Sequence, residues 1–400
     1  SIATFSWVQI SGETVSLSNS DSSSTTFTAP NSAGQLVFRL TATDNLGFES
    51  KDNVVVNITS SSANVLGKVT FDLVPFNTST NGLDYANTSA SPARGVLVET
   101  VDTSGNILQS TATDSSGNFT LNANPGTTMR IRVSAHLLQT NGAKWDVRVT
   151  DNTNGNAPYV TQGALFVSSE ANTERNIHLA SGWDGTSYSQ TRSAGPFAIL
   201  DAIYDTMQKF AAVNPSIAFP SLEVRWSPNN STASGKLEEG DIATSFYSNG
   251  EIYILGKEDE DTDEYDRHII IHEWGHYFED KLSRADSIGG PHSLSDRLDF
   301  RVAFGEGWGN AISAMVTDDI FYRDSFESQQ SQGWWSNINN NNTTNAGWFN
   351  EGSVQSILYD IYDDDSEARD NIALGLGPIY SVLTDTDYRN QPYFTSIYTF

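Results

Sequence analysis

The chain has 400 residues, and 49 Asp and Glu against 22 Lys and Arg give it a formal net charge of −27. This charge argues against nucleic acid and anionic membrane surfaces as partners. The chain has no cysteine, which excludes cysteine catalysis and thiolate metal ligands. It also has no run of 18 apolar residues and no signal peptide, so we expect no transmembrane helix. A β-rich chain without disulfides fits a secreted or cell-surface bacterial protein whose leader is removed or lies outside these residues.

Residues 1–58 predict a small all-β domain. Strand-like runs at residues 14–18, 36–40 and 54–58 alternate with Ser, Asn and Gly turns, the pattern of a small sandwich. The segments 6–12 and 40–47 resemble bacterial PKD-like extracellular domains. Such domains begin one or two strands earlier, so we expect residue 1 to lie inside a domain of a longer protein.

A second β-sandwich is predicted over residues 64–181, after a Ser-rich linker at residues 59–62. It resembles a carboxypeptidase-regulatory-like, transthyretin-type domain in three runs, at residues 67–71, 95–99 and 112–119. The resemblance implies a spacer or a weak binding module rather than a catalyst.

The remainder, residues 182–400, begins with one predicted helix and three short strands. Apolar residues recur at helical spacing over residues 197–213. Runs rich in β-branched and aromatic residues predict strands at residues 222–226, 242–247 and 251–255. This mixture predicts an α+β domain after two all-β sandwich domains.

An acidic segment follows, in which seven of the nine residues 258–266 are carboxylates. Oxygen ligands of this kind could hold Ca²⁺, although EF-hand spacing is absent. The sequence favours the alternative, a solvated acidic loop whose residues 263–266 cap the next helix and place acidic side chains in its first turn.

The most informative motif is His272-Glu273-Trp274-Gly275-His276, which reads His-Glu-x-x-His. On a helix, residues i and i+4 lie on the same face, so His272 and His276 can bind one Zn²⁺. Glu273 is then placed to act as general base on a water molecule at the metal. A surface helix with two histidines at this spacing is the alternative.

Glu306 is the predicted third zinc ligand, because His₂Glu is a known catalytic zinc set that leaves one position for water. It lies in a predicted second helix, between Gly305 and Gly307, with Gly309 close by. Glycines are costly in a helix but permit two backbones to approach closely. Asn310, one turn after Glu306, is placed to accept a hydrogen bond from a ligand histidine.

These motifs resemble the gluzincin metallopeptidases, and the Gly-Glu-Gly-Trp sequence around Glu306 is similar to that of fungalysin-type proteases. The family has an aspartate where this chain has Asn310, which keeps an acceptor but removes a charge. The resemblance implies a peptidase in which a strand at the sheet edge pairs with extended substrate, and residues 251–255 are the expected edge. We expect an endopeptidase, with cleavage at a peptide terminus as the alternative.

Peptide hydrolysis passes through a tetrahedral oxyanion. The sequence does not single out the residue that would donate a hydrogen bond to it. The resemblance implies a Tyr or His beside the zinc, and we consider Tyr359, Tyr362 and His292, together with Arg297. His268, one turn before His272, is expected to be a supporting or core residue. Tryptophans in the polar segment 328–351 predict either substrate contacts or anchors of a loop.

The sequence therefore predicts a secreted zinc metallopeptidase that acts on extracellular proteins or glycoproteins. The alternative is an adhesin or matrix-binding protein that retains a zinc-protease scaffold. The presence of Glu273 favours the enzyme, because a scaffold has no need of a general base.

Overall fold

The computed structural model describes residues 1–400 except residues 31–32, 59–62, 340–343 and 365–371. The linker expected at residues 59–62 lies outside the described residues. The chain divides into two compact units. The first comprises Ser1–Val65, Asn122–Met129 and Phe166–Glu174, and the second comprises Leu66–Leu121, Arg130–Leu165 and Arg175–Phe400.

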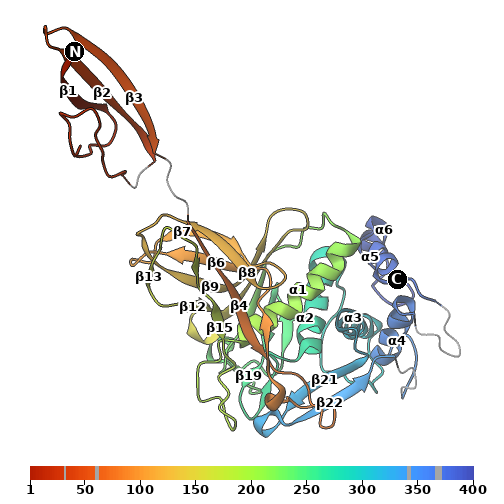
Figure 1. The fold of residues 1–400 in the computed structure, drawn as a ribbon. Coiled ribbons are helices and arrows are strands. Elements are labelled where there is room, and N and C mark those ends of the chain that lie inside the picture. Colours follow the sequence, from red (N-terminus) through yellow and green to blue (C-terminus); the bar gives the residue numbers. More distant parts are fainter. Residues whose placement is uncertain (31–32, 59–62, 340–343, 365–371) are drawn as a thin grey trace. The chain divides into compact units, whose positions relative to one another are not determined.

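The N-terminal part of the first unit is a three-stranded antiparallel sheet (Figure 1). Its strands, in the order β1-β2-β3, are β1 (Ile2–Ser11), β2 (Gly34–Asp44) and β3 (Glu49–Ile58). Asp44 Oδ1 accepts hydrogen bonds from Leu46 N and Phe48 N, both 2.9 Å long, and closes the turn between β2 and β3. Leu36 and Phe38 of β2 are buried.

Residues 14–18 are not a strand, so this prediction from the sequence is wrong. The side chain of Gln9 accepts a 3.0 Å hydrogen bond from Val15 N, which removes this group from strand pairing. The described strands within residues 1–58 form one sheet rather than the two facing sheets expected of a sandwich.

Two sheets account for most of the β-structure that follows. The five-stranded sheet contains β4 (Ala63–Leu73), β5 (Ser89–Pro92), β8 (Asn118–Ala123), β14 (Thr173–Glu174) and β15 (Ile177–Leu179). The ten-stranded sheet runs β17-β18-β16-β10-β9-β6-β7, with β11 (Ala157–Pro158), β12 (Val160–Gln162) and β13 (Phe166–Val167) attached to β10 or β9. Buried residues alternate with exposed residues along β8 and mostly with half-buried residues along β9, as expected for strands with one face in a core.

The ten-stranded sheet contains strands from both sides of the domain boundary that the sequence predicts between residues 181 and 182. Its first part contains β6 (Val96–Val101), β7 (Ile107–Ala112), β9 (Thr128–Gln139) and β10 (Trp145–Asp151). Its second part contains β16 (Leu222–Trp226), β17 (Phe246–Ser248) and β18 (Glu251–Ile254). The parts join where β10 pairs in parallel with β16, Val149 opposite Val224. The two predicted domains therefore share one hydrogen-bonded sheet.

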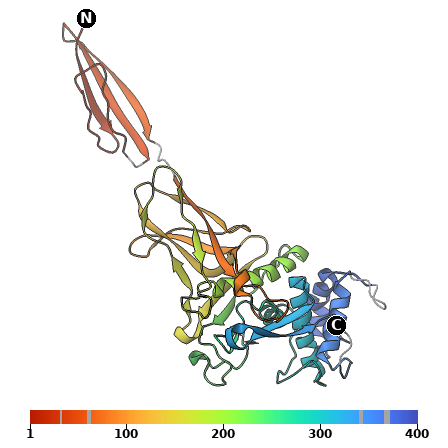
Figure 2. The ribbon, with the colours of Figure 1, turned by 60° about the horizontal axis from the view of Figure 1, so that its bottom comes forward.

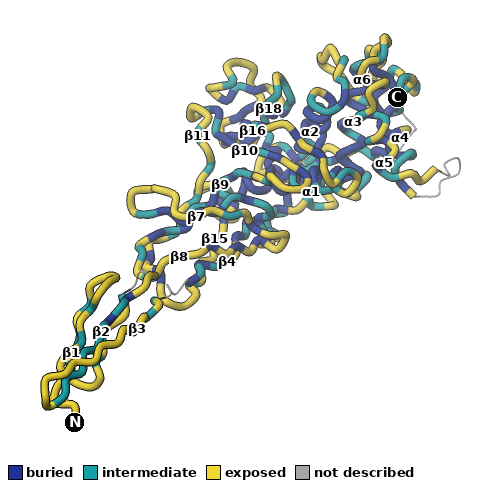
Figure 3. Tube along the Cα trace, turned by 90° about the horizontal axis from the view of Figure 1, so that it is seen from above, coloured by how far each residue is buried: buried dark blue, intermediate teal, exposed yellow. Residues whose placement is uncertain are grey.

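Six α-helices follow in the described part of residues 182–400 (Figure 1). They are α1 (Gly195–Val213), α2 (Arg267–Leu282), α3 (Phe300–Thr317), α4 (Glu351–Tyr362), α5 (Leu376–Thr384) and α6 (Thr386–Asn390). The helix predicted at residues 197–213 is confirmed as α1. Aromatic rings join three helices: Phe210 of α1 lies 4.7 Å from Phe278 of α2, and Phe278 lies 5.8 Å from Trp308 of α3, between ring centroids. Large parts of α1, α2 and α3 are buried (Figure 3).

A small four-stranded sheet lies beside α2 and α3 (Figures 1 and 2). It contains β19 (Gly256–Lys257), β20 (Asp261–Thr262), β21 (Phe321–Phe326) and β22 (Gln332–Asn337). The described chain also has four short 3-10 turns, η1 (Tyr85–Asn87), η2 (Asn152–Asn154), η3 (Leu237–Glu239) and η4 (Ser328–Gln330). Within the described ranges, every helix is too short or too polar to span a bilayer.

Candidate metal centre and active-site cavity

Helix α2 carries the His-Glu-x-x-His motif and starts later than the sequence predicts. Its N-cap is Asp266, and its first turn contains no acidic residue, so that expectation is wrong. The Asp266 carboxylate does not cap the helix, because it accepts hydrogen bonds from Ser325 N (2.5 Å) and Ser325 Oγ (3.0 Å). This contact connects the start of α2 to β21.

Helices α2 and α3 approach closely at two glycines. A Cβ atom on Gly309 of α3 would lie 2.7 Å from His272 Nδ1, and one on Gly275 of α2 would lie 3.1 Å from Gly309 Cα. Trp308 Nε1 donates a 3.1 Å hydrogen bond to Gly275 O across the same contact. The absence of side chains here lets α3 present Glu306 directly to the histidines of α2.

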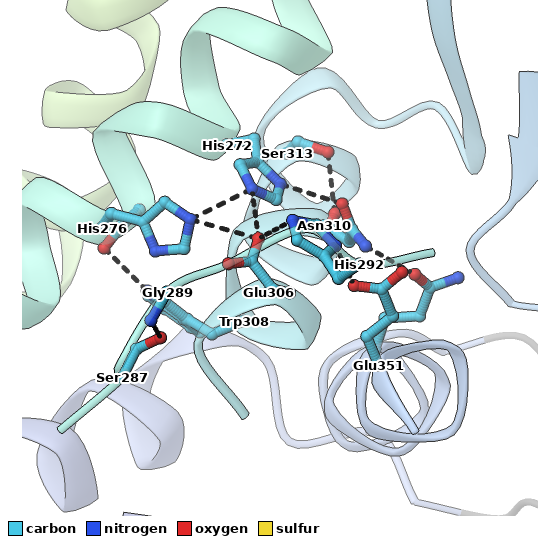
Figure 4. A network of polar contacts seen from close by, with 12 residues as sticks. His272, His276, Ser287, Gly289, His292, Glu306, Trp308, Asn310, Ser313 and Glu351 are labelled. Carbon is cyan, nitrogen blue, oxygen red and sulfur yellow. Dashed lines mark hydrogen bonds and ion pairs between the residues drawn. The ribbon is translucent and has the colours of Figure 1, made fainter. Parts of the chain in front are cut away.

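Three donor atoms from these helices meet at one point (Figure 4). His272 Nε2 lies 3.1 Å from both His276 Nε2 and Glu306 Oε2, and His276 Nε2 lies 3.4 Å from Glu306 Oε2. Ligand atoms of tetrahedral zinc, with bonds of about 2.0–2.1 Å, lie about 3.3–3.4 Å apart. His272, His276 and Glu306 therefore have the donor types and the spacing of a catalytic zinc site.

Each histidine has a partner for its other ring nitrogen. His272 Nδ1 lies 2.9 Å from Asn310 Oδ1, and Asn310 Nδ2 donates a 2.9 Å hydrogen bond to Gln355 Oε1 of α4. His276 Nδ1 lies 3.4 Å from Glu279 Oε2. Donation from Nδ1 leaves the Nε2 lone pair free for a metal and fixes the orientation of the ring. The sequence analysis missed Glu279, although its i+3 spacing from His276 on the helix could have indicated it.

Glu273 and Glu306 are both buried in this site but differ in their acidity. Burial raises the pKa of Glu273, and the charges of His272 and His276 oppose this rise. Burial alone would also raise the pKa of Glu306, but His276 and His272 outweigh it and hold this pKa well below its usual value. Glu306 thus keeps its negative charge beside the two imidazoles.

His292 is brought to the centre from the loop between the two motifs (Figure 4). Its Nε2 lies 3.3 Å from Glu306 Oε2, and its Nδ1 lies 2.8 Å from Glu351 Oε2. The hydrogen bond to Glu351 is the largest cause of a raised His292 pKa. Glu351 is the first residue of α4 and is 3% exposed. The sequence analysis did not identify Glu351, because 59 residues separate it from His292.

The structure does not bring Tyr359 or Tyr362 into the cavity that holds these residues. Tyr362 Oη donates a 3.2 Å hydrogen bond to Met315 O, and Tyr359 is a buried residue of α4 beside it, with ring centroids 5.8 Å apart. Arg297 is also outside the cavity lining and donates a 3.1 Å hydrogen bond to Asn345 Oδ1. His268 lies buried, with Nδ1 2.9 Å from Ser313 Oγ.

Tyr322 of β21 is a further site residue that the sequence analysis missed. Its ring centroid lies 6.1 Å from that of His272, and the residue lines the cavity. Burial raises the pKa of Tyr322 well above its usual value, with Asp324 and Glu273 adding to the rise, so the phenol keeps its proton. The sequence around Tyr322 contains no motif that predicts a site residue. Tyr322 reaches His272 only because of the fold of the β21–β22 hairpin.

The cavity has a volume of about 940 Å³ and is bounded on one side by β17. Thr244, Phe246, Tyr247 and Ser248 line it from this strand and its approach, and Trp334 lines it from β22. The sequence prediction that residues 251–255 form the sheet edge is wrong. β18 lies between β16 and β17, so β17 is the edge strand.

Comparison with known proteins found two matching family models. Residues 212–395 match the family model of the Mycolysin C-terminal domain, and residues 1–58 match a PKD domain model. No curated protein matches the chain. Similar solved structures include BcpA, the major pilin subunit of Bacillus cereus (12% identity, TM-score 0.21), and a variant of that pilin (12%, 0.20). Each match covers 38% of this chain and 39% of the pilin, so the chain spans well under half of the pilin's length.

The two domain matches support a fungalysin-type metallopeptidase context for this multidomain chain. The Mycolysin match suggests a protease with a peptide substrate and implies zinc as its metal. Both matched domains are typical of extracellular proteins.

Proposed function

We propose that this chain is a secreted, bacterial zinc endopeptidase that hydrolyses peptide bonds of extracellular proteins or glycoproteins. The observation that carries the proposal is the spacing of His272 Nε2, His276 Nε2 and Glu306 Oε2, at 3.1–3.4 Å from one another. Glu273 lines the same cavity beside them. The match of residues 212–395 to the Mycolysin C-terminal domain supports the assignment.

His272, His276 and Glu306 would hold the metal, with Asn310 and Glu279 keeping the two imidazoles in place. Zinc bound there supplies a Lewis acid that polarises a water molecule and the carbonyl of the scissile bond. Glu273 takes a proton from the attacking water and delivers it to the leaving amine, acting first as general base and then as general acid.

His292 and Tyr322 are the proposed donors to the oxyanion that develops on the substrate carbonyl. His292 Nε2 faces the metal ligands while Glu351 holds Nδ1 at 2.8 Å, which favours an imidazolium able to donate from both nitrogens. Tyr322 provides a phenol that lines the cavity and keeps its proton. Donors positioned in advance are effective because they need no reorganisation during the reaction.

The edge strand β17 is the proposed binding site for the substrate backbone. An edge strand offers unpaired N–H and C=O groups, to which an extended peptide can add as a further strand. β17 lines the cavity that holds Glu273, so a peptide paired with β17 passes the proposed general base. Backbone pairing of this kind demands no particular sequence, and Tyr247 and Trp334 are placed to contact substrate side chains.

The test is a search for new termini by mass spectrometry. Unfolded proteins and glycoproteins would be incubated with the zinc-loaded protein and with its Glu273→Gln variant. We expect internal cleavage by the wild type and a rate lower by about 10²–10⁴-fold in the variant, with zinc content unchanged. Equal cleavage by both proteins would refute the role of Glu273. Absence of cleavage by the zinc-loaded wild type would favour a binding protein built on this scaffold.

A further inference from the structure

A second group of possible metal ligands lies in the wall of the same cavity. Asp261 belongs to β20, Asp263 follows two residues later, and Asp324 belongs to β21. Each residue offers one carboxylate oxygen, and these three atoms lie within 4.8 Å of one another. All three residues line the cavity, and none has a role in the proposed hydrolysis.

Asp263 is buried and Asp261 and Asp324 are half-buried, which contradicts the interpretation of the acidic segment as a solvated loop at these positions. Asp263 is 3% exposed, and its neighbours Glu264 and Asp266 are also buried. Burial raises the pKa of Asp261 to about 6, with Glu264 and Glu260 adding to the rise and a hydrogen bond with Asp263 opposing it. Burial raises the pKa of Asp324 to about 7, and the charge of Asp261 adds to this rise. Burying like charges together is strongly unfavourable unless a cation or a hydrogen-bond donor compensates them.

Within the described residues, hydrogen bonds leave one oxygen of each carboxylate unused. Ser245 Oγ donates to Asp263 Oδ2, while Asp263 Oδ1 is buried and accepts no hydrogen bond from the described part of the chain. Asp261 Oδ1 and Asp324 Oδ1 are buried and unpartnered in the same way. Glu264 and Asp266, by contrast, are engaged by Arg192 and Ser325 respectively. Glu264 Oε2 is also unpartnered, but Arg192 neutralises that carboxylate, whereas no cationic side chain of the described residues pairs with the three aspartates that converge.

We propose that Asp261, Asp263 and Asp324 bind a calcium ion. The donor set consists of oxygen alone, which suits a hard cation rather than zinc. Ca²⁺ takes six to eight oxygen ligands in a flexible shell, whereas Mg²⁺ demands near-ideal octahedral geometry and is usually bound by only one or two carboxylates. Three converging carboxylates therefore suit Ca²⁺, and water from the cavity would complete its shell.

The position of the site indicates a structural role beside the zinc helix. The ion connects β20, the segment that leads into α2, and β21. Asp266, the N-cap of α2, is bound to Ser325, the residue after Asp324. Calcium would therefore fix the start of α2 relative to β21, the strand that carries Tyr322.

The test measures calcium binding by the zinc-loaded chain, independently of any hydrolysis. Equilibrium dialysis with ⁴⁵Ca²⁺ and thermal unfolding in calcium-free and calcium-containing buffer would compare wild type with Asp263→Asn and Asp324→Asn. The matched control is Asp259→Asn in the same loop, since Asp259 is exposed and its positive φ of 62° is tolerated by asparagine.

We expect the wild type and the control to bind one Ca²⁺ and to unfold at a temperature that rises with calcium concentration. The Asp263→Asn and Asp324→Asn variants should keep their zinc but lose this rise. In calcium-free buffer they should unfold no earlier than the wild type, because the substitution removes like-charge repulsion. The proposal fails if the wild type binds no calcium at millimolar concentration, or if both variants bind it as the control does.

Discussion

The zinc-ligand cluster (His272, His276, Glu306) and the acidic cluster (Asp261, Asp263, Asp324) line one cavity but differ in how their donors are supported. In the zinc-ligand cluster both histidines have a hydrogen-bond partner, and the glutamate carboxylate lies against imidazole nitrogens. In the acidic cluster each carboxylate keeps a buried oxygen without a partner among the described residues.

This difference separates two kinds of metal site. In the zinc-ligand cluster, Asn310 and Glu279 hold the orientation of the two imidazoles. Within the described residues, the acidic cluster receives a hydrogen bond from outside only at Asp263, from Ser245, so we expect its geometry to depend on a cation. Four further experiments would test or refine this contrast, beginning with the one expected to have the largest effect.

Replacing Glu306 with Gln should abolish function at the zinc-ligand cluster and leave the acidic cluster unaffected. The variant loses an anionic ligand. We therefore expect zinc affinity and hydrolysis to fall by more than about 100-fold, which is the largest effect expected when only a residue supporting a ligand is lost. Zinc content by elemental analysis and calcium binding by dialysis would be measured together. Retention of full zinc affinity would exclude Glu306 as a ligand.

Replacing His292 with Gln should lower kcat by about 10²–10³-fold with zinc content unchanged, as for removal of one oxyanion donor. Glu351→Gln should have a smaller effect, because glutamine can still accept a hydrogen bond from His292 Nδ1. Tyr362→Phe is the control, since its hydroxyl donates to Met315 O outside the cavity lining. Steady-state kinetics in which the control loses more activity than His292→Gln would contradict the assignment.

Replacing Asn310 with Ala should weaken zinc binding by about 10–100-fold, because His272 loses the acceptor that orients its ring. Asn310→Asp keeps the acceptor and should bind zinc at least as tightly as the wild type. Competition with a chromophoric chelator would measure both affinities. Equal affinities of the alanine variant and the wild type would show that the zinc-ligand cluster needs no such support.

The fourth experiment concerns His268, a histidine of α2 that belongs to neither cluster. Burial lowers its pKa from 6.5 to about 3, while Asp319 opposes this shift and Arg323 and Arg267 add to it. The unfolded chain therefore binds a proton that the folded chain does not, and stability should fall as pH decreases from 6.5 towards 3.

Replacing His268 with Asn should remove this contribution, which amounts to at most about 1.4 kcal/mol per pH unit. Urea unfolding of zinc-free protein between pH 6.5 and 4 would compare the variant with the wild type. Zinc-free protein is required because the ligand histidines also release metal at low pH. Identical pH dependence in the two proteins would show that His268 is not buried in its neutral form.

The sequence alone was enough to anticipate features that depend on local periodicity. The i, i+4 spacing of His272 and His276 defines a face of α2 whatever surrounds it, because helical geometry is local. Glycines at 305, 307 and 309 indicated a close approach, and Gly309 does lie against His272. The roles of His272, Glu273, His276, Glu306 and Asn310 as ligands, base and support stay predictions until metal binding is measured.

Only the tertiary structure decided which distant residues meet. Local pattern does not tell which strand pairs with which, so the sequence did not reveal that β10 joins β16 or that β17 forms the sheet edge. The same holds for Glu351 beside His292, Tyr322 beside His272 and Asp324 beside Asp263. An acidic run predicts a solvated segment because carboxylates are usually exposed. Whether it is buried depends on the strand that packs against it, which here is β21, some sixty residues further along the chain.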